Sequence, residues 1–389
     1  MKTVGVLFGG RSVEHEVSVI TAMQVIENID KTKYKPVPIY INKDGEWLTG
    51  ESLMNFDNYK SNNFNDAKKV ILSPNHNDSN LYLHPEKSGL FAKKILESID
   101  IFFPAFHGTN GEDGAIQGLL ELINKPYAGA GILGSSVGMD KILMKDVYKA
   151  NGIPVVDYIW FYRSDFRDDK KATMDKVESS LGYPVFVKPS NLGSSIGITK
   201  AKDRTMLENA LEVAASYDRK IIVEKAVEKP REINCSVMGY DNKVEASLCE
   251  EPLGWTEILS FNDKYLRKDG KKSSSASINR AIPADISSDK TSEIEELAKR
   301  AFTVIDARGN ARIDFLLDQE GKVYVNEINT LPGSIAFYLW EGKGYTFKDL
   351  INKMIDIGLA SQKEKDNNMY IYESNLFSKT QFGSKSTKM

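Results

Sequence analysis

Cysteine is scarce in this chain of 389 residues, which contains only Cys235 and Cys249. The two are too few and too far apart in sequence for a zinc site, and a disulfide framework needs a larger set. We therefore expect two buried thiols in a reducing compartment, which favours a cytoplasmic location.

Long apolar runs and a strong net charge are absent as well. No apolar run approaches the roughly 18 residues of a membrane-spanning helix, and the N-terminus leads directly into a predicted strand instead of a charged leader. The formal net charge of −3 offers no basic field for nucleic acid or anionic lipid. We expect small-molecule partners, and neither nucleic acid nor a membrane.

The composition is that of a folded protein, with 27% charged and 41% hydrophobic residues, and the length suffices for two or three domains. The pattern over residues 1–131 predicts an open α/β domain. Its predicted strands are residues 2–8, 36–41 and 101–106. Glu14 and His107 follow two of these strands at the edge where ligands gather in such sheets. For the polar residues 50–80 we predict a surface loop and a hairpin.

Two further units are predicted after residue 131. Strands are expected at residues 158–162, 184–188, 220–225 and 232–237, and helices at residues 139–150, 168–181 and 205–217. The lysine- and serine-rich residues 255–279 lack periodicity and predict either disorder or a functional lid. A helix with Ser288 as its predicted N-cap and a closing helix ending near Gly358 complete the last unit. Residues 361–389 are polar and we expect them to be mostly disordered.

Residues 184–200, PVFVKPSNLGSSIGITK, predict a strand, a glycine-serine turn and a second strand. Three uncharged β-formers precede Lys188, so this lysine ends a buried strand and requires an anion. The turn supplies backbone N–H groups and the hydroxyls of Ser194 and Ser195, which suit phosphate oxygens. Taken alone, the stretch equally fits an ordinary glycine-rich hairpin with a lysine that reaches solvent.

Residues 311–333, ARIDFLLDQEGKVYVNEINTLPG, predict a β-hairpin. Asp314 lies on its first strand, while Glu327 and Asn329 are two residues apart and share one face of its second strand. Two carboxylates and an amide oxygen suit Mg²⁺, which keeps waters and bridges substrate phosphates. Charges on a solvated face are the structural alternative, but they do not explain acids set between apolar neighbours.

These two stretches, in this order, resemble the ATP-grasp ligases. The stretches VGVLFGGRSVEHEVSVITA and FHGTNGEDGAIQGLLELINKPYAGAG, the Met139-Asp140-Lys141 run and residues 326–333 narrow the resemblance to the D-alanine:D-alanine ligase family. It spans residues 1–360. The resemblance implies an α/β (α+β) ATP-grasp fold. Its parts would be an N-terminal α/β substrate-binding domain (1–131), a central ATP-grasp subdomain (132–227) and a C-terminal ATP-grasp subdomain (228–360) with an ω-loop lid (255–279).

The resemblance also implies an activity and its residues. Two D-alanines would be joined through an acyl phosphate for peptidoglycan precursor synthesis, by a homodimer that uses ATP and one or two Mg²⁺ or Mn²⁺ ions. ATP would be bound by Lys141, Lys188, Ser195, Glu224, Lys225, Val227, Glu232 and Lys264, and the metal by Asp314, Glu327 and Asn329. The catalytic residues would be Glu14, Ser194, Tyr265, Arg312, Gly333 and Tyr338, with His107, Glu112 and Ser334 binding substrate.

The chemistry explains why these residue types are needed. A carboxylate forms an amide only after it gains a better leaving group, which ATP provides by phosphorylation. Lys141 and Lys188 can neutralise phosphates as point charges, and Arg312 can stabilise the tetrahedral oxyanion together with the Gly333 N–H. Glu14 would hold the ammonium of the first D-alanine.

One position departs from the family pattern. A small hydroxyl residue is expected five positions after Gly333, where it helps to bind the carboxylate of the second substrate, but the sequence has Tyr338. The pocket is then reshaped, or Ser334 substitutes, and D-serine or D-lactate remain alternative second substrates. From another class, a nucleotide-binding regulator without turnover is the alternative, although such a protein has no use for Arg312.

Overall fold

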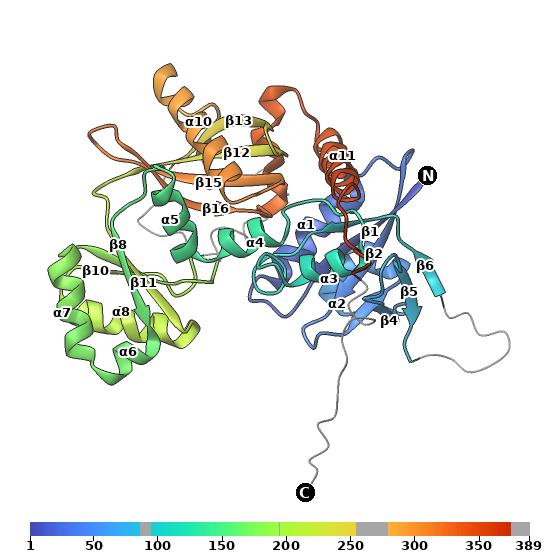
Figure 1. Ribbon diagram of the computed structural model, residues 1–389, viewed down its shortest axis with the longest axis horizontal. Coiled ribbons are helices and arrows are strands. Elements are labelled where there is room, and N and C mark those ends of the chain that lie inside the picture. The colour runs from blue at the N-terminus through green and yellow to red at the C-terminus, as the bar shows by residue number, and fades with distance from the viewer. Residues whose placement is uncertain (86–94, 194, 254–278, 375–389) are drawn as a thin grey trace, which may run out of the picture.

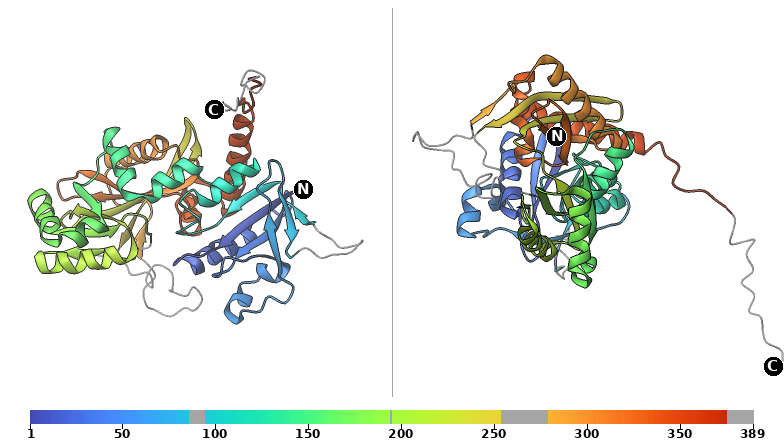
Figure 2. Two further views of the ribbon diagram at one scale, coloured as in Figure 1. Left: turned by 60° about the horizontal axis from the view of Figure 1, so that its bottom comes forward. Right: turned by 90° about the vertical axis from the view of Figure 1, so that its left-hand side faces the viewer.

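Three β-sheets organise the chain in the computed structural model, which describes residues 1–85, 95–193, 195–253 and 279–374. Figure 1 shows them in chain order, with an N-terminal unit in blue, a central unit in green and a C-terminal unit in yellow to red. In the left view of Figure 2 the N-terminal and central units lie at opposite ends of the molecule. The predicted fold class, α/β (α+β), is confirmed.

The N-terminal unit is built on a seven-stranded sheet in the order β6-β5-β4-β3-β2-β1-β7. Its strands are β1 (Lys2–Gly9), β2 (Tyr34–Ile41), β3 (Trp47–Thr49), β4 (Lys68–Leu72), β5 (Asn80–Leu83), β6 (Ile95–Ser98) and β7 (Ile101–Pro104). β1 pairs in parallel with β2 and β7, as the predicted open α/β pattern requires, and the other strands are antiparallel. Helices α1 (His15–Asn28) and α3 (Ala115–Ile123) follow β1 and β7.

The prediction of a loop and hairpin over residues 50–80 is wrong in part. The stretch contains the 3-10 helix η1 (Glu51–Met54), the helix α2 (Phe56–Ser61) and the strand β4, and Leu53 is fully buried. Val70 is the only buried residue of β4. β4 pairs antiparallel with β3 and with β5, so the hairpin part of the prediction is confirmed.

The central unit has a four-stranded sheet in the order β10-β9-β11-β8. Its elements are β8 (Tyr158–Tyr162), α6 (Arg163–Asp168), α7 (Lys170–Leu181), β9 (Val185–Pro189), β10 (Thr199–Ala201), α8 (Arg204–Tyr217) and β11 (Lys220–Lys225). The predicted strands and helices are confirmed. Buried Val185 and Val187 on β9 pack with Leu207 and Leu211 on α8, which holds the strand that carries Lys188.

The C-terminal unit has a five-stranded sheet in the order β14-β13-β12-β15-β16. Its strands are β12 (Arg231–Tyr240), β13 (Lys243–Leu253), β14 (Asn279–Ala281), β15 (Gly309–Leu317) and β16 (Val323–Asn329). The sequence did not predict β13. Cys235 and Cys249 are buried free thiols, as expected, and lie opposite each other on β12 and β13. The helix α10 (Ser288–Val304) covers this sheet, and its N-cap is Ser287 instead of the predicted Ser288.

Two helices join the units. After α4 (Ile132–Met139), the helix α5 (Lys141–Ala150) places Met144 and Tyr148 in the core of the C-terminal sheet, although α5 precedes the central sheet in sequence. Asp140 caps α5 by accepting hydrogen bonds from two of its N–H groups. The predicted boundary between subdomains at residue 131 stays a prediction, but α5 packs with the later unit.

The last helix packs back onto the first unit. Beyond the 3-10 helices η2 (Gly333–Leu339) and η3 (Glu341–Lys343), the helix α11 (Phe347–Lys365) shares a core with β1 through Ile351, Met354 and Ile355 (Figure 1). We predicted that this helix ends near Gly358, which is wrong. A Cβ at Gly358 would lie 2.5 Å from the Tyr127 carbonyl oxygen, so this glycine permits close packing instead of ending the helix.

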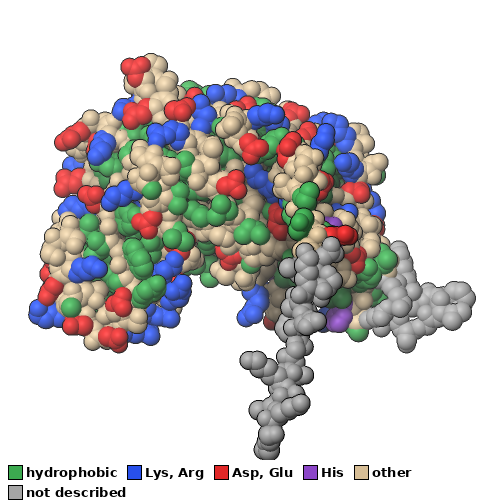
Figure 3. Space-filling model, viewed as in Figure 1, with side chains coloured by type: hydrophobic (Ala, Val, Ile, Leu, Met, Phe, Trp, Pro, Cys, Tyr) green, Lys and Arg blue, Asp and Glu red, His purple; other side chains and the backbone are tan. Residues whose placement is uncertain are grey.

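The first residues of the tail that was expected to be disordered are part of α11. Residues 361–365 are helical, Tyr370 and Tyr372 are exposed, and residues 375–389 lie outside the described part. None of the described helices carries an apolar stretch long enough to cross a bilayer. On the face shown in Figure 3, acidic and basic side chains are interspersed, in agreement with the small net charge.

Replacing Met354 with alanine tests the contact between α11 and the N-terminal unit. Met354 is fully buried, so its truncation should lower the free energy of unfolding by about 2–5 kcal/mol. Urea unfolding measures the change, with exposed Lys353→Ala on the same helix as the control. Equal effects of the two substitutions would show that α11 is not part of this core.

Candidate active site

The predicted metal ligands lie together on β15 and β16. Asp314 is directly opposite Glu327, and Arg312 is directly opposite Asn329. The Arg312 guanidinium donates to both carboxylate oxygens of Asp314, at 2.6 and 2.7 Å, and the Asn329 amide donates to Asp314 at 3.2 Å. Burial disfavours the charged guanidinium, but Asp314 outweighs this effect and holds the pKa of Arg312 well above its ordinary value. The shared strand face predicted for these residues is confirmed.

The same row of side chains continues across the sheet. Asn234 on β12 is opposite Asp314, and Glu250 on β13 is opposite Asn234. The Asn234 amide donates to Glu250 at 3.1 Å, and Glu250 is buried. Together with Glu327, the row places three carboxylates and one amide on one face of four neighbouring strands.

A buried cluster of charges joins this sheet to the central one. Glu224 on β11 accepts from Lys188 on β9 at 2.7 Å and lies 3.3 Å from the Lys145 ammonium on α5. Lys145 also donates to the backbone carbonyl of Asn326 on β16, at 3.3 Å. Burial alone would raise the pKa of Glu224, but the two lysines lower it to about 2. Lys188 and the strand β16 are therefore linked through Lys145 on helix α5.

The turn after β9 is held from several sides. Lys141 donates to the Leu192 carbonyl at 2.7 Å, and the Asn191 backbone and amide both donate to Asp218, at 2.8 and 3.1 Å. Ser195 has a left-handed backbone, with φ of +59°. The predicted residue Ser194 lies outside the described residues, as do Lys264 and Tyr265 and the expected lid through residue 278.

Glu14 of the N-terminal unit approaches the turn that follows β9. A Cβ at Gly193 would lie 3.0 Å from a carboxylate oxygen of Glu14, and one at Gly108 would lie 2.7 Å from the same oxygen. A side chain at either position would press on this carboxylate, and Gly108 also has a left-handed backbone, with φ of +75°. The structure thus brings Glu14, the residue after His107 and the turn before Ser194 to one place.

His107 is buried and contacts the C-terminal unit. Thr21 accepts the Ser334 N–H at 3.3 Å, so its hydroxyl proton can be donated to His107 Nε2, which is 2.8 Å away. The ring also hydrogen-bonds the backbone of Leu331, but burial outweighs this and lowers the pKa of His107 to about 4. The ring is therefore neutral near pH 7, and through Thr21 it is tied to Ser334.

Glu112 binds the backbone of Gly108, the residue that follows His107. Its carboxylate accepts the Gly108 N–H at 2.6 Å and a backbone hydrogen bond from Leu331. Burial, and next the charge of Glu14, raise the pKa of Glu112 to about 8. The loop from Leu331 to Ser334 is thus held by two groups of the N-terminal unit.

Comparison with known proteins agrees with this geometry. The family model described as D-ala D-ala ligase N-terminus matches residues 3–130, and the one described as D-ala D-ala ligase C-terminus matches residues 147–356. The chain belongs to the D-alanine–D-alanine ligase family. Its relatives include the D-alanine–D-alanine ligases of Thermosipho africanus (43% identical, covering 97% of this chain and 98% of the relative) and Geobacillus kaustophilus (39%, covering 96% and 99%).

Solved structures of the family are similar over nearly the whole chain. The D-alanine-D-alanine ligase from Coxiella burnetii matches with a TM-score of 0.77 and 30% identity, covering 94% of this chain and 97% of that one. The VanG D-Ala:D-Ser ligase from Enterococcus faecalis matches with a TM-score of 0.75 and 30% identity, covering 92% and 99%.

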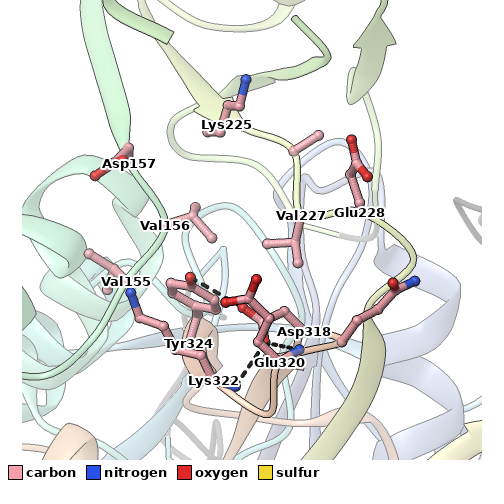
Figure 4. A pocket seen from close by; sticks show the side chains of 12 residues that line it. Val155, Val156, Asp157, Lys225, Val227, Glu228, Asp318, Glu320, Lys322 and Tyr324 are labelled. Carbon is pink, nitrogen blue, oxygen red and sulfur yellow. Dashed lines mark hydrogen bonds between the residues drawn. The ribbon is translucent and has the colours of Figure 1, made fainter.

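The residues predicted to hold the adenosine lie at the hinge after β11. Val227 and Lys225 line a pocket of about 360 Å³ that also involves Tyr324 on β16 (Figure 4). The Lys225 ammonium points away from this pocket and donates to the carbonyls of Leu181 and Tyr183, at 2.8 and 3.2 Å. Glu232 lies near the start of β12, opposite Leu316. The nucleotide roles of these residues in this ligase-family chain stay predictions.

Sequence reasoning missed Lys145, Asn234, Glu250 and Thr21. Lys145 follows Lys141 by one helical turn, and i, i+4 spacing would have placed both on one face of the helix. Glu250 lies on β13, which was not predicted, and Asn234 gains meaning only from the strand opposite it. No local pattern distinguishes Thr21 from other residues of α1.

Replacing Lys145 with methionine tests the buried charge cluster. Glu224 would keep only Lys188 as a partner, so the free energy of unfolding should fall by about 3–5 kcal/mol. Lys149→Met, at an exposed position of the same helix, should change it by less than about 0.5 kcal/mol. A urea midpoint for Lys145→Met that matches the control would contradict the cluster's role.

Glu112→Gln tests the raised pKa of this carboxyl. Between its ordinary value of 4.5 and about 8, folded Glu112 keeps a proton that the unfolded chain releases, so the stability it contributes is lost as pH rises. The melting temperature of the wild type should therefore fall relative to Glu112→Gln from pH 5 to 9. The titration of His107 changes the stability of both proteins equally. The difference between their melting temperatures therefore reports on Glu112 alone. A constant difference would contradict the assignment.

Proposed function

We propose that the protein is an ATP-dependent ligase that joins two D-alanines into D-alanyl-D-alanine through an acyl phosphate, for peptidoglycan precursor synthesis. The observation that carries the proposal is the meeting of two distant segments at α5. Lys188 and Glu224 from the central sheet and Asn326 from the metal strand are joined through Lys145. A nucleotide held by Lys188 would then present its phosphates to Asp314 and Glu327.

The donor set supports a magnesium ion that depends on the nucleotide. Groups of three or more His, Cys, Asp or Glu side chains suited to a metal do not occur in the part of the chain that is described. Asp314 and Glu327 lie opposite each other, and Asn329 adds an amide. Mg²⁺ is commonly held by one or two carboxylates together with substrate phosphates, so these residues fit one or two such ions. When bound, the metal would offset charge on the transferring phosphoryl group.

The remaining groups divide between the two amino acids. Glu14 would bind the ammonium of the first D-alanine, near Gly193 and Gly108. Arg312 already binds a carboxylate in a bidentate manner, and it would stabilise the oxyanion that forms when the second amine attacks the acyl phosphate. His107, being neutral and tied to Thr21, would position the loop that ends at Gly333 and Ser334.

We infer a cytoplasmic homodimer from the same family relationship. The division into 1–131, 132–227 and 228–360 also belongs to the proposal. D-Alanine:D-serine ligation is the second candidate, because Tyr338 stands where a small hydroxyl residue is expected and one similar structure is a D-Ala:D-Ser ligase.

Purified protein with ATP, Mg²⁺ and D-alanine tests the proposal. We expect ADP release that depends on D-alanine, and mass spectrometry should identify D-alanyl-D-alanine as the product. Parallel reactions with D-serine or D-lactate as the added second substrate separate the alternatives. ATP binding without release of phosphate would favour a nucleotide-binding regulator instead.

Glu327→Gln tests the metal assignment. The loss of one of two carboxylates should reduce turnover at least about 100-fold, because the charge on the transferring phosphoryl group is no longer balanced. Circular dichroism and the melting temperature should stay close to the wild type. Glu296→Gln, at an exposed position of α10 in the same unit, is the matched control and should leave turnover unchanged. Unchanged ligation by Glu327→Gln would exclude Glu327 as a metal ligand.

A further inference from the structure

Arg280 lies on the face of the C-terminal sheet that carries the predicted metal ligands. On β14 it is opposite Pro252 of β13, two residues after Glu250. Residues two apart on a strand share a face, so Arg280 projects from the same face as Glu250, and thus as the row that continues to Asp314. No sequence motif singles out Arg280.

Arg280 is braced by two side chains. Its guanidinium carbon lies 4.3 Å from the centroid of the Tyr338 ring, which is the geometry of a cation–π contact. Its Nη1 lies 3.4 Å from Glu250, whose other carboxylate oxygen lies 3.3 Å from the Tyr338 hydroxyl. Glu250 is 4% exposed and also accepts from Asn234, so it is a fixed anchor for the pair.

These contacts explain why a bulky residue, Tyr338, occupies this position. Its ring supports a guanidinium, which a small hydroxyl residue at this position could not do. The residue lies at the end of an unusual backbone, because Ser334, Ile335 and Ala336 all have left-handed φ values between 46° and 51°. Such strain persists only where the surroundings hold it, and it often accompanies ligand sites.

Arg280 retains the capacity to bind an anion. A guanidinium has five N–H donors in a planar fork, and the ion pair of Arg280 Nη1 with Glu250, at 3.4 Å, is longer than the 2.6 and 2.7 Å bonds by which Arg312 holds Asp314. One third of the side chain is exposed, at 33%. Arg312, whose charge also interacts with Tyr338 and Glu250, is bound in a bidentate manner by Asp314. Of the two arginines around Tyr338, Arg280 is therefore the one placed to receive a carboxylate from solvent.

We propose that Arg280, supported by Tyr338 and Glu250, binds the carboxylate of the second amino acid. The proposal rests on the ligase function above. Tyr338 then acts as a positioning residue through its ring, and its hydroxyl donates a hydrogen bond to Glu250. Because D-alanine, D-serine and D-lactate carry the same carboxylate, Arg280 sets the affinity for the second substrate but not the choice among these three.

Steady-state kinetics test this assignment, since the first and second D-alanine have separate KM values. Arg280→Gln should raise the KM for the second D-alanine about 10- to 100-fold, the usual effect of losing hydrogen bonds to a charged group. The KM values for ATP and for the first D-alanine should change less than about twofold. Arg280→Lys keeps the charge but not the planar fork of donors. Its KM for the second D-alanine should lie between those of the wild type and Arg280→Gln.

A matched control and a ring series separate this role from a general structural one. Arg231→Gln removes an arginine that pairs with Glu251, the neighbour of Glu250 that points to the opposite face, and it should leave both KM values unchanged. Tyr338→Ser should raise the KM for the second D-alanine more than Tyr338→Phe, because only the latter keeps the ring. Equal effects of Tyr338→Ser on both D-alanine sites would overturn the placement.

D-Alaninamide as the second substrate gives the decisive comparison, because it lacks the carboxylate. Wild type should prefer D-alanine over D-alaninamide, and Arg280→Gln should lose most of this preference, measured as the ratio of the two products by mass spectrometry. If the wild type ligates and Arg280→Gln or Arg280→Lys keeps the preference, the assignment of Arg280 is wrong while the ligase function stands. If the wild type releases no ADP with D-alanine, the ligase function itself is wrong.

Discussion

The structure depends on one buried carboxylate, Glu224, held between Lys145 and Lys188. A buried charge is tolerated only when it is paired, and here the two partners come from different parts of the chain. Lys188 belongs to the central sheet, whereas Lys145 lies on a helix packed into the C-terminal core and bonded to the backbone of β16. The cluster therefore ties the central sheet to the C-terminal sheet, and it includes Lys188, the lysine proposed to bind phosphate.

A second joint connects these sheets to the N-terminal unit. The loop that follows β16 is held by Thr21, His107 and Glu112, so the strand that carries Glu327 leads directly to the part of the molecule that carries Glu14. The packing of α11 against β1 strengthens the same connection. A ligase that must bring a phosphate donor and two amino acids together requires such joints, because reacting groups must be placed within a few tenths of an ångström.

The balance of charge in the site is local. Arg312 is paired with Asp314, and Arg280 with Glu250, along one row of the sheet. Each carboxylate holds an arginine in place before any substrate is bound, which lowers the entropy lost when the substrate binds. Asp314, which is proposed to hold the metal ion, is thus also the residue that fixes the Arg312 guanidinium.

The errors in the expected elements are explained by contacts between distant parts of the chain. Gly358 resembles a helix terminator, yet it lies inside α11 because the backbone of Tyr127 approaches it closely. The stretch expected to be a surface loop instead forms η1 and α2, because Leu53 is buried in the core that β1 and α1 share. In both cases a contact from a distant part of the chain decides the outcome, and such contacts leave no trace in a short window of sequence.

The sequence by itself determined most of the elements, the family and the alternating polar residues of β15 and β16. Arg312, Asp314, Glu327 and Asn329 occupy alternating positions in a hairpin, and alternation along a strand is a property of the local chain. Only the tertiary structure decided that Lys145 and Glu250 belong to the site, and that Arg280 lies against Tyr338. Their positions depend on which strands are neighbours in the sheet and on which core a helix joins, and packing over long sequence separations sets both.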